Sequence, residues 1–141
     1  MPSERWVSRR TQAAVLAAVA VGGALGAAAR YGVSVWLPSP PGTFAWSTFM
    51  INVSGCLLIG MLMALIGERW SAHRLLRPFL GTGVLGGYTT FSAYTIDAYV
   101  LLDGGHVRLG FAYLAATVVC ALAAVCVGMF VIRWVATARL P

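Results

Sequence analysis

The chain has 141 residues, 60% of them hydrophobic and 10% charged, with a formal net charge of +6 and a mean hydropathy of +0.82. Because a water-soluble domain carries roughly 25% charged residues, this composition excludes an ordinary soluble domain and indicates an integral membrane protein. The positive charge comes from ten arginines. They lie in short segments between apolar runs, which argues against a nucleic-acid-binding face.

Runs of about twenty apolar residues are long enough to cross the hydrocarbon core of a bilayer as helices. The sequence contains four such runs, at about residues 11–37, 43–67, 78–102 and 108–136. We expect them to form four transmembrane helices of a single membrane domain that covers residues 1–141. The predicted fold class is therefore an all-α membrane protein, and since four short helices enclose little space, we expect a dimeric assembly.

The arginines also predict an orientation in the membrane. If both termini lie on one side, that side carries eight arginines and the opposite side carries Arg108 alone, with Arg30 inside a span. The eight are Arg5, Arg9, Arg10, Arg69, Arg74, Arg77, Arg133 and Arg139. The positive-inside rule then places both termini in the cytoplasm of a multi-pass protein of the cell membrane.

The first two spans carry residues that plain lipid-facing helices lack. Gly22, Gly23 and Gly26 form a small-residue face that lets another helix approach closely. Arg30 follows in the same span, where a charge is costly, so it either faces an interface or cavity or extends towards the headgroups. In the second span, Asn52 needs polar partners, which are either another helix or an anion in a narrow pore.

The third predicted span contains the most unusual run, from Gly81 to Thr95. Two consecutive glycines followed by hydroxyl residues favour a helix broken at mid-membrane depth, where freed backbone groups can bind ions. The alternative is a glycine kink whose hydroxyls bond back along their own helix. In the fourth span, Tyr113 and Thr117 are four residues apart and therefore share one helix face.

The sequence lacks the motifs that enzymes use. Cys56, Cys120 and Cys126 lie in apolar runs, without a CxxC pair or a nearby ligand set, so we interpret them as packing residues rather than zinc ligands or disulfide partners. There is no nucleotide-binding loop and no nucleophile paired with a base. We therefore expect that the protein is not an enzyme.

Three segments, in order along the chain, are similar to sequence motifs of one protein family. Gly22 to Tyr31 is similar to GGxxGAxxRY, Ser47 to Gly60 to GTxxxNxxGxFxxG, and Gly81 to Tyr94 to GxxGGxTTFSTF, the most specific of the three. Together they resemble the CrcB family of bacterial fluoride channels, also called Fluc, over essentially the whole chain. Tyr94 stands where the pattern has Phe, and Ser47 and Leu57 replace a Gly and a Phe.

The resemblance implies a fluoride-specific channel of the bacterial inner membrane that passively exports fluoride and lowers its toxicity. It implies an antiparallel dimer with two fluoride pathways and a structural sodium ion (Na⁺) that is not transported. The carbonyls of Gly86 and Thr89 would hold the sodium ion, and Arg30 would serve the subunit interface or attract anions. The implied fluoride pathway consists of Asn52, Phe91, Ser92, Tyr94, Tyr113 and Thr117.

The arginine bias makes a further prediction about the partner chain. A chain that inserts both ways should have almost no bias, so we expect this chain to keep one orientation and to pair with an oppositely inserted homologue rather than with itself.

Two other functions compete with the channel. A small dimeric multidrug or metabolite transporter would need a membrane-embedded carboxylate, and a membrane scaffold would leave Asn52 without a purpose.

Overall fold

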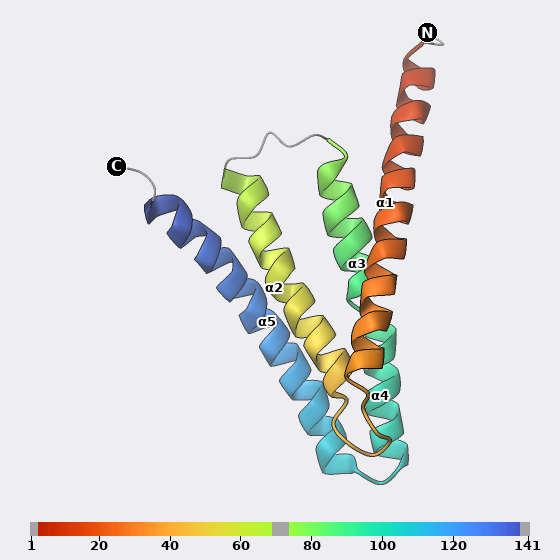
Figure 1. Cartoon of the computed structure of the whole chain (residues 1–141), viewed down its shortest axis with the longest axis vertical. Helices are drawn as coiled ribbons and strands as arrows, with labels where there is room; N and C mark the ends of the chain where they lie inside the picture. Colours follow the sequence, from red (N-terminus) through yellow and green to blue (C-terminus); the bar gives the residue numbers. More distant parts are fainter. Residues whose placement is uncertain (1–2, 69–73, 139–141) are drawn as a thin grey trace.

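The computed structural model describes residues 3–68 and 74–138, with side chains for 9–67 and 74–138, and this part is all-helical without a strand (Figure 1). Its elements are α1 (Ser3–Trp36), α2 (Trp46–Glu68), η1 (Pro78–Leu85), α3 (Gly86–Tyr88), α4 (Phe91–Asp103) and α5 (Val107–Ala138). α1 thus begins at Ser3 rather than near residue 11, and α2 begins at Trp46 rather than near residue 43.

Three helices of the described chain are long and apolar enough to cross a membrane. They comprise Arg9–Trp36, Trp46–Gly67 and Val107–Ala138. The fourth expected span, 78–102, is built instead from η1, α3 and α4 in succession, and η1 is a π-helix. Because this span is composed of shorter pieces, none of them alone has the length of a membrane-crossing helix.

The helices pack in two closely spaced pairs, α1 with η1 and α2 with α5 (Figure 1). Glycines allow the close approach: a Cβ at Gly26 would collide with the Val84 carbonyl oxygen, and one at Gly60 would collide with the Val125 carbonyl oxygen. The predicted small-residue face of the first span is therefore confirmed. It packs against η1 and α3.

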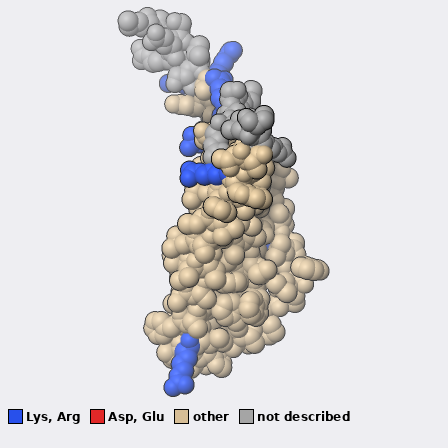
Figure 2. Space-filling model, turned by 90° about the vertical axis from the view of Figure 1, so that its left-hand side faces the viewer, with Lys and Arg blue, Asp and Glu red and all other residues tan. Residues whose placement is uncertain are grey.

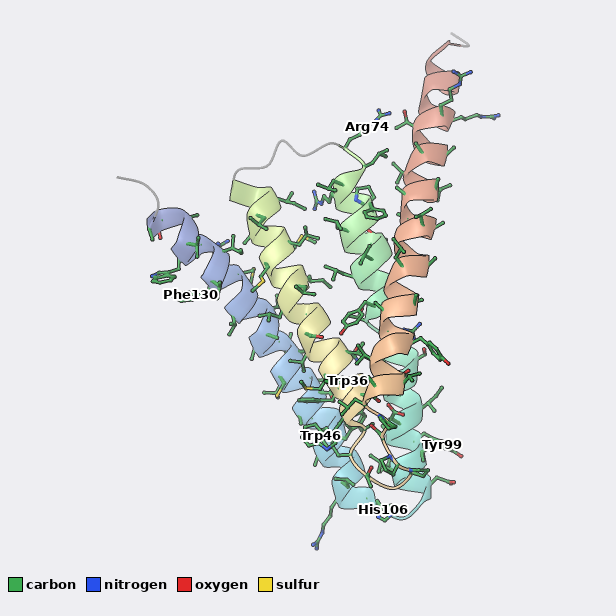
Figure 3. All side chains as sticks on the ribbon, viewed as in Figure 1. Trp36, Trp46, Arg74, Tyr99, His106 and Phe130 are labelled. Atoms are coloured by element: carbon green, nitrogen blue, oxygen red, sulfur yellow. The ribbon has the colours of Figure 1, made fainter. Side chains whose placement is uncertain are left out.

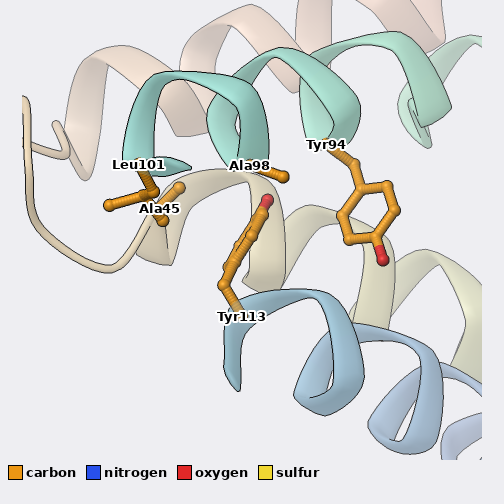
Figure 4. Close-up of a cluster of buried hydrophobic side chains, with 5 residues drawn as sticks. All are labelled: Ala45, Tyr94, Ala98, Leu101 and Tyr113. Carbon is orange, nitrogen blue, oxygen red and sulfur yellow. The ribbon is translucent and has the colours of Figure 1, made fainter. Parts of the chain in front are cut away.

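The main cluster of buried apolar side chains lies where α4 meets α5 and the start of α2. It contains Ala45, Tyr94, Ala98, Leu101 and Tyr113 (Figure 4), and Tyr113 is completely buried. Many large apolar side chains elsewhere are exposed, for example Phe130 at 67%. Such an apolar outer surface is suited to contact with lipid or with another membrane chain.

Arginine side chains gather at one end of the described molecule, with a single one at the opposite end (Figure 2). The first group lies where α1 and η1 begin and where α5 ends, and comprises Arg9, Arg10, Arg74, Arg77 and Arg133; Arg108 is at the start of α5. Arg5, Arg69 and Arg139, which also belong to the predicted set, lie outside the described side chains.

Candidate functional site

Two residues interrupt the helical chain between α3 and α4. Thr89 has a ψ of 156°, and Thr90 has φ and ψ of −148° and 124°, so both have extended backbone at this point. The Thr90 hydroxyl accepts a hydrogen bond from the Ala93 N–H at 3.1 Å and so caps the start of α4. The interruption is therefore a defined structure that ends one helix and starts another.

The Asn52 side chain on α2 holds this interruption with two hydrogen bonds. Its Nδ2 donates to the Thr90 carbonyl at 3.0 Å, and its Oδ1 accepts from the Thr90 N–H at 2.9 Å. An asparagine amide has two N–H donors, so one of them is still available after both bonds are made. The two roles considered for Asn52, a partner on another helix and a donor to an anion, are consequently compatible.

The interruption also frees backbone carbonyl groups. In a continuous helix, the Gly86 and Thr89 carbonyls would accept from the N–H groups of Thr90 and Ala93, four residues on. Those N–H groups donate instead to the Asn52 side chain and to the Thr90 hydroxyl. Gly86 and Thr89 are the two residues expected to bind sodium, and carbonyl oxygens without helical partners fit a hard cation.

A pocket of about 240 Å³ lies beside the interruption and contains four of the six predicted fluoride-pathway residues. Its lining consists of Asn52, Cys56, Thr89, Thr90, Phe91, Tyr94, Thr117, Val118 and Ala121. The rings of Phe91 and Tyr94 have centroids 5.7 Å apart; Phe91 is 80% exposed and Tyr94 is buried. The other two predicted residues, Ser92 and Tyr113, are not part of this lining.

The hydroxyl groups of the predicted pathway already have protein partners. Those of Tyr94 and Thr117 donate to backbone carbonyls, at 3.0 Å and 2.8 Å, and Ser92 pairs with the Thr90 hydroxyl at 3.2 Å. Tyr113 donates to Asp97 at 3.3 Å, which is long for a hydroxyl donor. An anion in the pathway must therefore compete with these acceptors for the hydroxyls of Tyr94, Thr117 and Tyr113.

Arg30 lies in a different pocket from Asn52. This second pocket has a volume of about 290 Å³ and is lined by Ala27, Arg30, Tyr31, Ser34, Thr48, Ile51, Thr90 and Ala93. The Arg30 Nε is buried and has no hydrogen-bond partner among the described residues. Thr90 belongs to both linings, so the interruption is the element shared by the Arg30 pocket and the Asn52 pocket.

Two contacts at the site were not anticipated from the sequence. The Tyr88 hydroxyl lies 3.0 Å from the Ser54 hydroxyl, which itself donates to the Met50 carbonyl at 2.6 Å, so Tyr88 is the donor of the pair. The second is the backbone of Thr90 as the partner of Asn52. Threonine is a preferred helix N-cap residue, and this preference was the sequence signal for a role of Thr90 at the start of α4. Nothing in the sequence indicated that Ser54 would pair with Tyr88.

Comparison with known proteins shows the family to which this chain is similar. Residues 17–129 match the family described as CrcB-like protein, Camphor Resistance (CrcB). The chain belongs to the CrcB-like family. It is 52% identical to "Fluoride-specific ion channel FluC 2" of Nocardia farcinica, over 86% of either chain. It is 57% identical to "Fluoride-specific ion channel FluC 1" of Streptomyces coelicolor, over 82% of this chain and 75% of the relative.

A more distant relative shows the same similarity across nearly its full length. The chain is 45% identical to "Fluoride-specific ion channel FluC" of Paracoccus denitrificans, over 82% of this chain and 91% of the relative. The match to the CrcB-like family includes α2, η1, α3 and α4, and therefore the whole interruption and Asn52.

Proposed function

We propose that this CrcB-like chain is a fluoride-specific ion channel that passively exports fluoride from the cytoplasm. Its relatives are named fluoride-specific ion channels, and the observation that carries the proposal is the Asn52 pocket. There the Asn52 amide, which has one N–H donor left, lines the same pocket as the exposed ring of Phe91. Fluoride is small and strongly hydrated, so a selective pore must replace its water with closely placed donors.

The residues of the pocket can supply such donors in sequence. The free Asn52 N–H meets the ion, the electropositive ring edges of Phe91 and Tyr94 contact it, and the Thr117 hydroxyl turns from its protein acceptor towards it. Outside this lining, the Tyr113 hydroxyl would continue the pathway. A membrane potential of about 100 mV, negative inside, contributes ~2.3 kcal/mol to the exit of each anion. A passive pathway therefore suffices, and the activity is transport rather than catalysis.

The proposed mid-membrane depth of the interruption is supported by the helix beside it. Gly23, close to the middle of the apolar stretch Arg9–Trp36, contacts Gly87 just before the interruption. This contact supports an interruption at mid-membrane depth in a single membrane domain. The arginine-rich end faces the cytoplasm of a bacterial cell in this proposal, so both termini lie inside.

The proposed assembly is an antiparallel dimer, with an oppositely inserted homologous chain favoured over a second copy of this one. Its support is the unequal arginine distribution and the exposure of Gly86 and Phe91 in the single chain. Carbonyls of Gly86 and Thr89 from each subunit would hold the structural sodium ion. The ion would supply positive charge that offsets the facing carbonyl dipoles.

Efflux from liposomes tests the proposed function. The purified chain is reconstituted alone, and a fluoride electrode records release while chloride release is measured in parallel. Fluoride release without chloride release is expected of a channel, and from this chain alone it would contradict the preference for a second homologue. If well-folded protein releases nothing, we expect an oppositely biased homologue to restore release; no release from the mixture would contradict the channel and favour a scaffold.

A further inference from the structure

Four exposed arginines occupy the end of the molecule where α1 and η1 begin. Arg9 and Arg10 belong to α1, and Arg74 and Arg77 precede the first residue of η1 (Figures 2 and 3). The acidic side chains that the structure describes, Asp97 and Asp103, belong to α4. Glu4 in α1 and Glu68 at the end of α2 belong to the arginine-rich end, where they are outnumbered by Arg9, Arg10, Arg74, Arg77 and Arg133, so this end carries a net positive charge.

The contacts between α1 and η1 give the relative depth of these arginines. Gly22 meets Gly83 of η1, and Gly26 meets Tyr88 of α3, so α1 and the continuous stretch of η1 and α3 run in the same direction. With this register, Arg77 is about level with residue 16 of α1, and Arg74 lies slightly further out. Arg9 and Arg10 lie further out again, by about 10 Å relative to Arg77 at 1.5 Å per residue.

Exposed aromatic side chains mark the opposite membrane boundary. Trp36 at the end of α1 is 84% exposed, and Tyr99 and Trp46 lie at the same end of the molecule (Figure 3). Measured along α1, Trp36 is about 30 Å from the level of Arg77, the thickness of the hydrocarbon core. It is about 39 Å from Arg10, close to the thickness with headgroups included.

We propose that Arg9, Arg10, Arg74 and Arg77 form a binding site for the phosphate headgroups of anionic phospholipids. The inner pair lies at the hydrocarbon boundary and the outer pair in the headgroup layer, so the two pairs meet lipid phosphates from two depths. Guanidinium groups bind phosphate oxygens with paired N–H donors. Each arginine near an anionic membrane surface contributes roughly five-fold to binding.

Native mass spectrometry tests this site without relying on fluoride transport. The full chain in non-ionic detergent is mixed with equal amounts of phosphatidylglycerol and phosphatidylcholine, and the lipids that remain bound are counted. We expect the chain to retain phosphatidylglycerol in preference to phosphatidylcholine. The affinity for phosphatidylglycerol should be about 25-fold weaker in each of the double variants Arg74→Gln/Arg77→Gln and Arg9→Gln/Arg10→Gln. Arg108→Gln, which removes an exposed arginine at the opposite end, should retain the lipid as the unchanged chain does.

Several results would overturn the proposal. Equal retention in the double variants would show that these arginines do not bind the lipid, and an equal loss in Arg108→Gln would show a general charge effect instead of a site. Displacement of phosphatidylglycerol by millimolar inorganic phosphate would assign the site to a free anion. If a double variant does not fold, the single variants Arg74→Gln and Arg77→Gln carry the test, with about five-fold weaker retention expected for each.

Discussion

Replacing Asn52 by Ala removes the side chain that joins α2 to the interruption. Both hydrogen bonds to Thr90 are lost, and the Thr90 N–H and carbonyl are left without these partners. Each unsatisfied buried group costs about 1–3 kcal/mol. Because Thr90 and Asn52 are only half-buried, the lower part of that range applies. We therefore expect Asn52→Ala to lower the free energy of unfolding by about 2 kcal/mol.

The same substitution should also slow transport. Removing a donor to a charged group costs about 1.5–3 kcal/mol, which corresponds to a rate of fluoride efflux lower by roughly 10- to 160-fold. Ser54→Ala is the matched control, because Ser54 lies on the same helix, bonds to Tyr88 and does not line the Asn52 pocket. It should lower stability by about 1 kcal/mol and leave fluoride efflux nearly unchanged.

Unfolding in mixed detergent micelles and efflux from liposomes measure the two effects separately. If the free energy of unfolding of Asn52→Ala equals that of the unchanged chain, the paired hydrogen bonds to Thr90 do not stabilise the interruption. If its efflux is also unchanged, Asn52 is not a donor to fluoride. A loss of efflux of the same size in Ser54→Ala would attribute the effect to general destabilisation.

Three further predictions follow from individual contacts. Gly26→Ala places a methyl group against the Val84 carbonyl and should cost at least ~3 kcal/mol of stability, whereas Gly32→Ala, with open space around it, should leave thermal unfolding unchanged or slightly stabilised. Tyr88→Phe removes the hydrogen bond to Ser54 and should cost about 1 kcal/mol; an unchanged unfolding free energy would contradict that bond. Replacing sodium by N-methylglucamine throughout purification should dissociate the proposed dimer in light scattering, and an intact dimer would contradict a structural sodium ion.

The coarse fold could be predicted from the sequence because its signals are local. Apolar runs of sufficient length predicted the helical spans, and Gly22 and Gly26 predicted a close helix contact that the structure confirms. The start of α1 at Ser3 could not be predicted in this way, since the polar residues before the apolar run extend the helix without belonging to the apolar pattern. Hydropathy describes the membrane-crossing part of a helix, not its full length.

The geometry of the site was less predictable because its partners are distant in sequence. The need of Asn52 for a partner was clear from its apolar surroundings, but the partner is a backbone group 38 residues away. Residue type likewise does not show where a hydroxyl donates. Tyr94 reaches the Leu114 carbonyl on α5, and Thr117 bonds back to its own helix. Only the three-dimensional arrangement separates such hydroxyls from free ones.

A helix interruption frees donors and acceptors together, and the Asn52 side chain separates the two. It takes up both the N–H and the carbonyl of Thr90, while the Gly86 and Thr89 carbonyls lose the donors that a continuous helix would provide. Acceptors then predominate on the backbone, where a cation is favoured, and the remaining amide N–H lies on the α2 side, where an anion is favoured. One side chain thereby leaves backbone acceptors and an amide donor at the same interruption, which the proposed fixed cation and the proposed moving anion would each require.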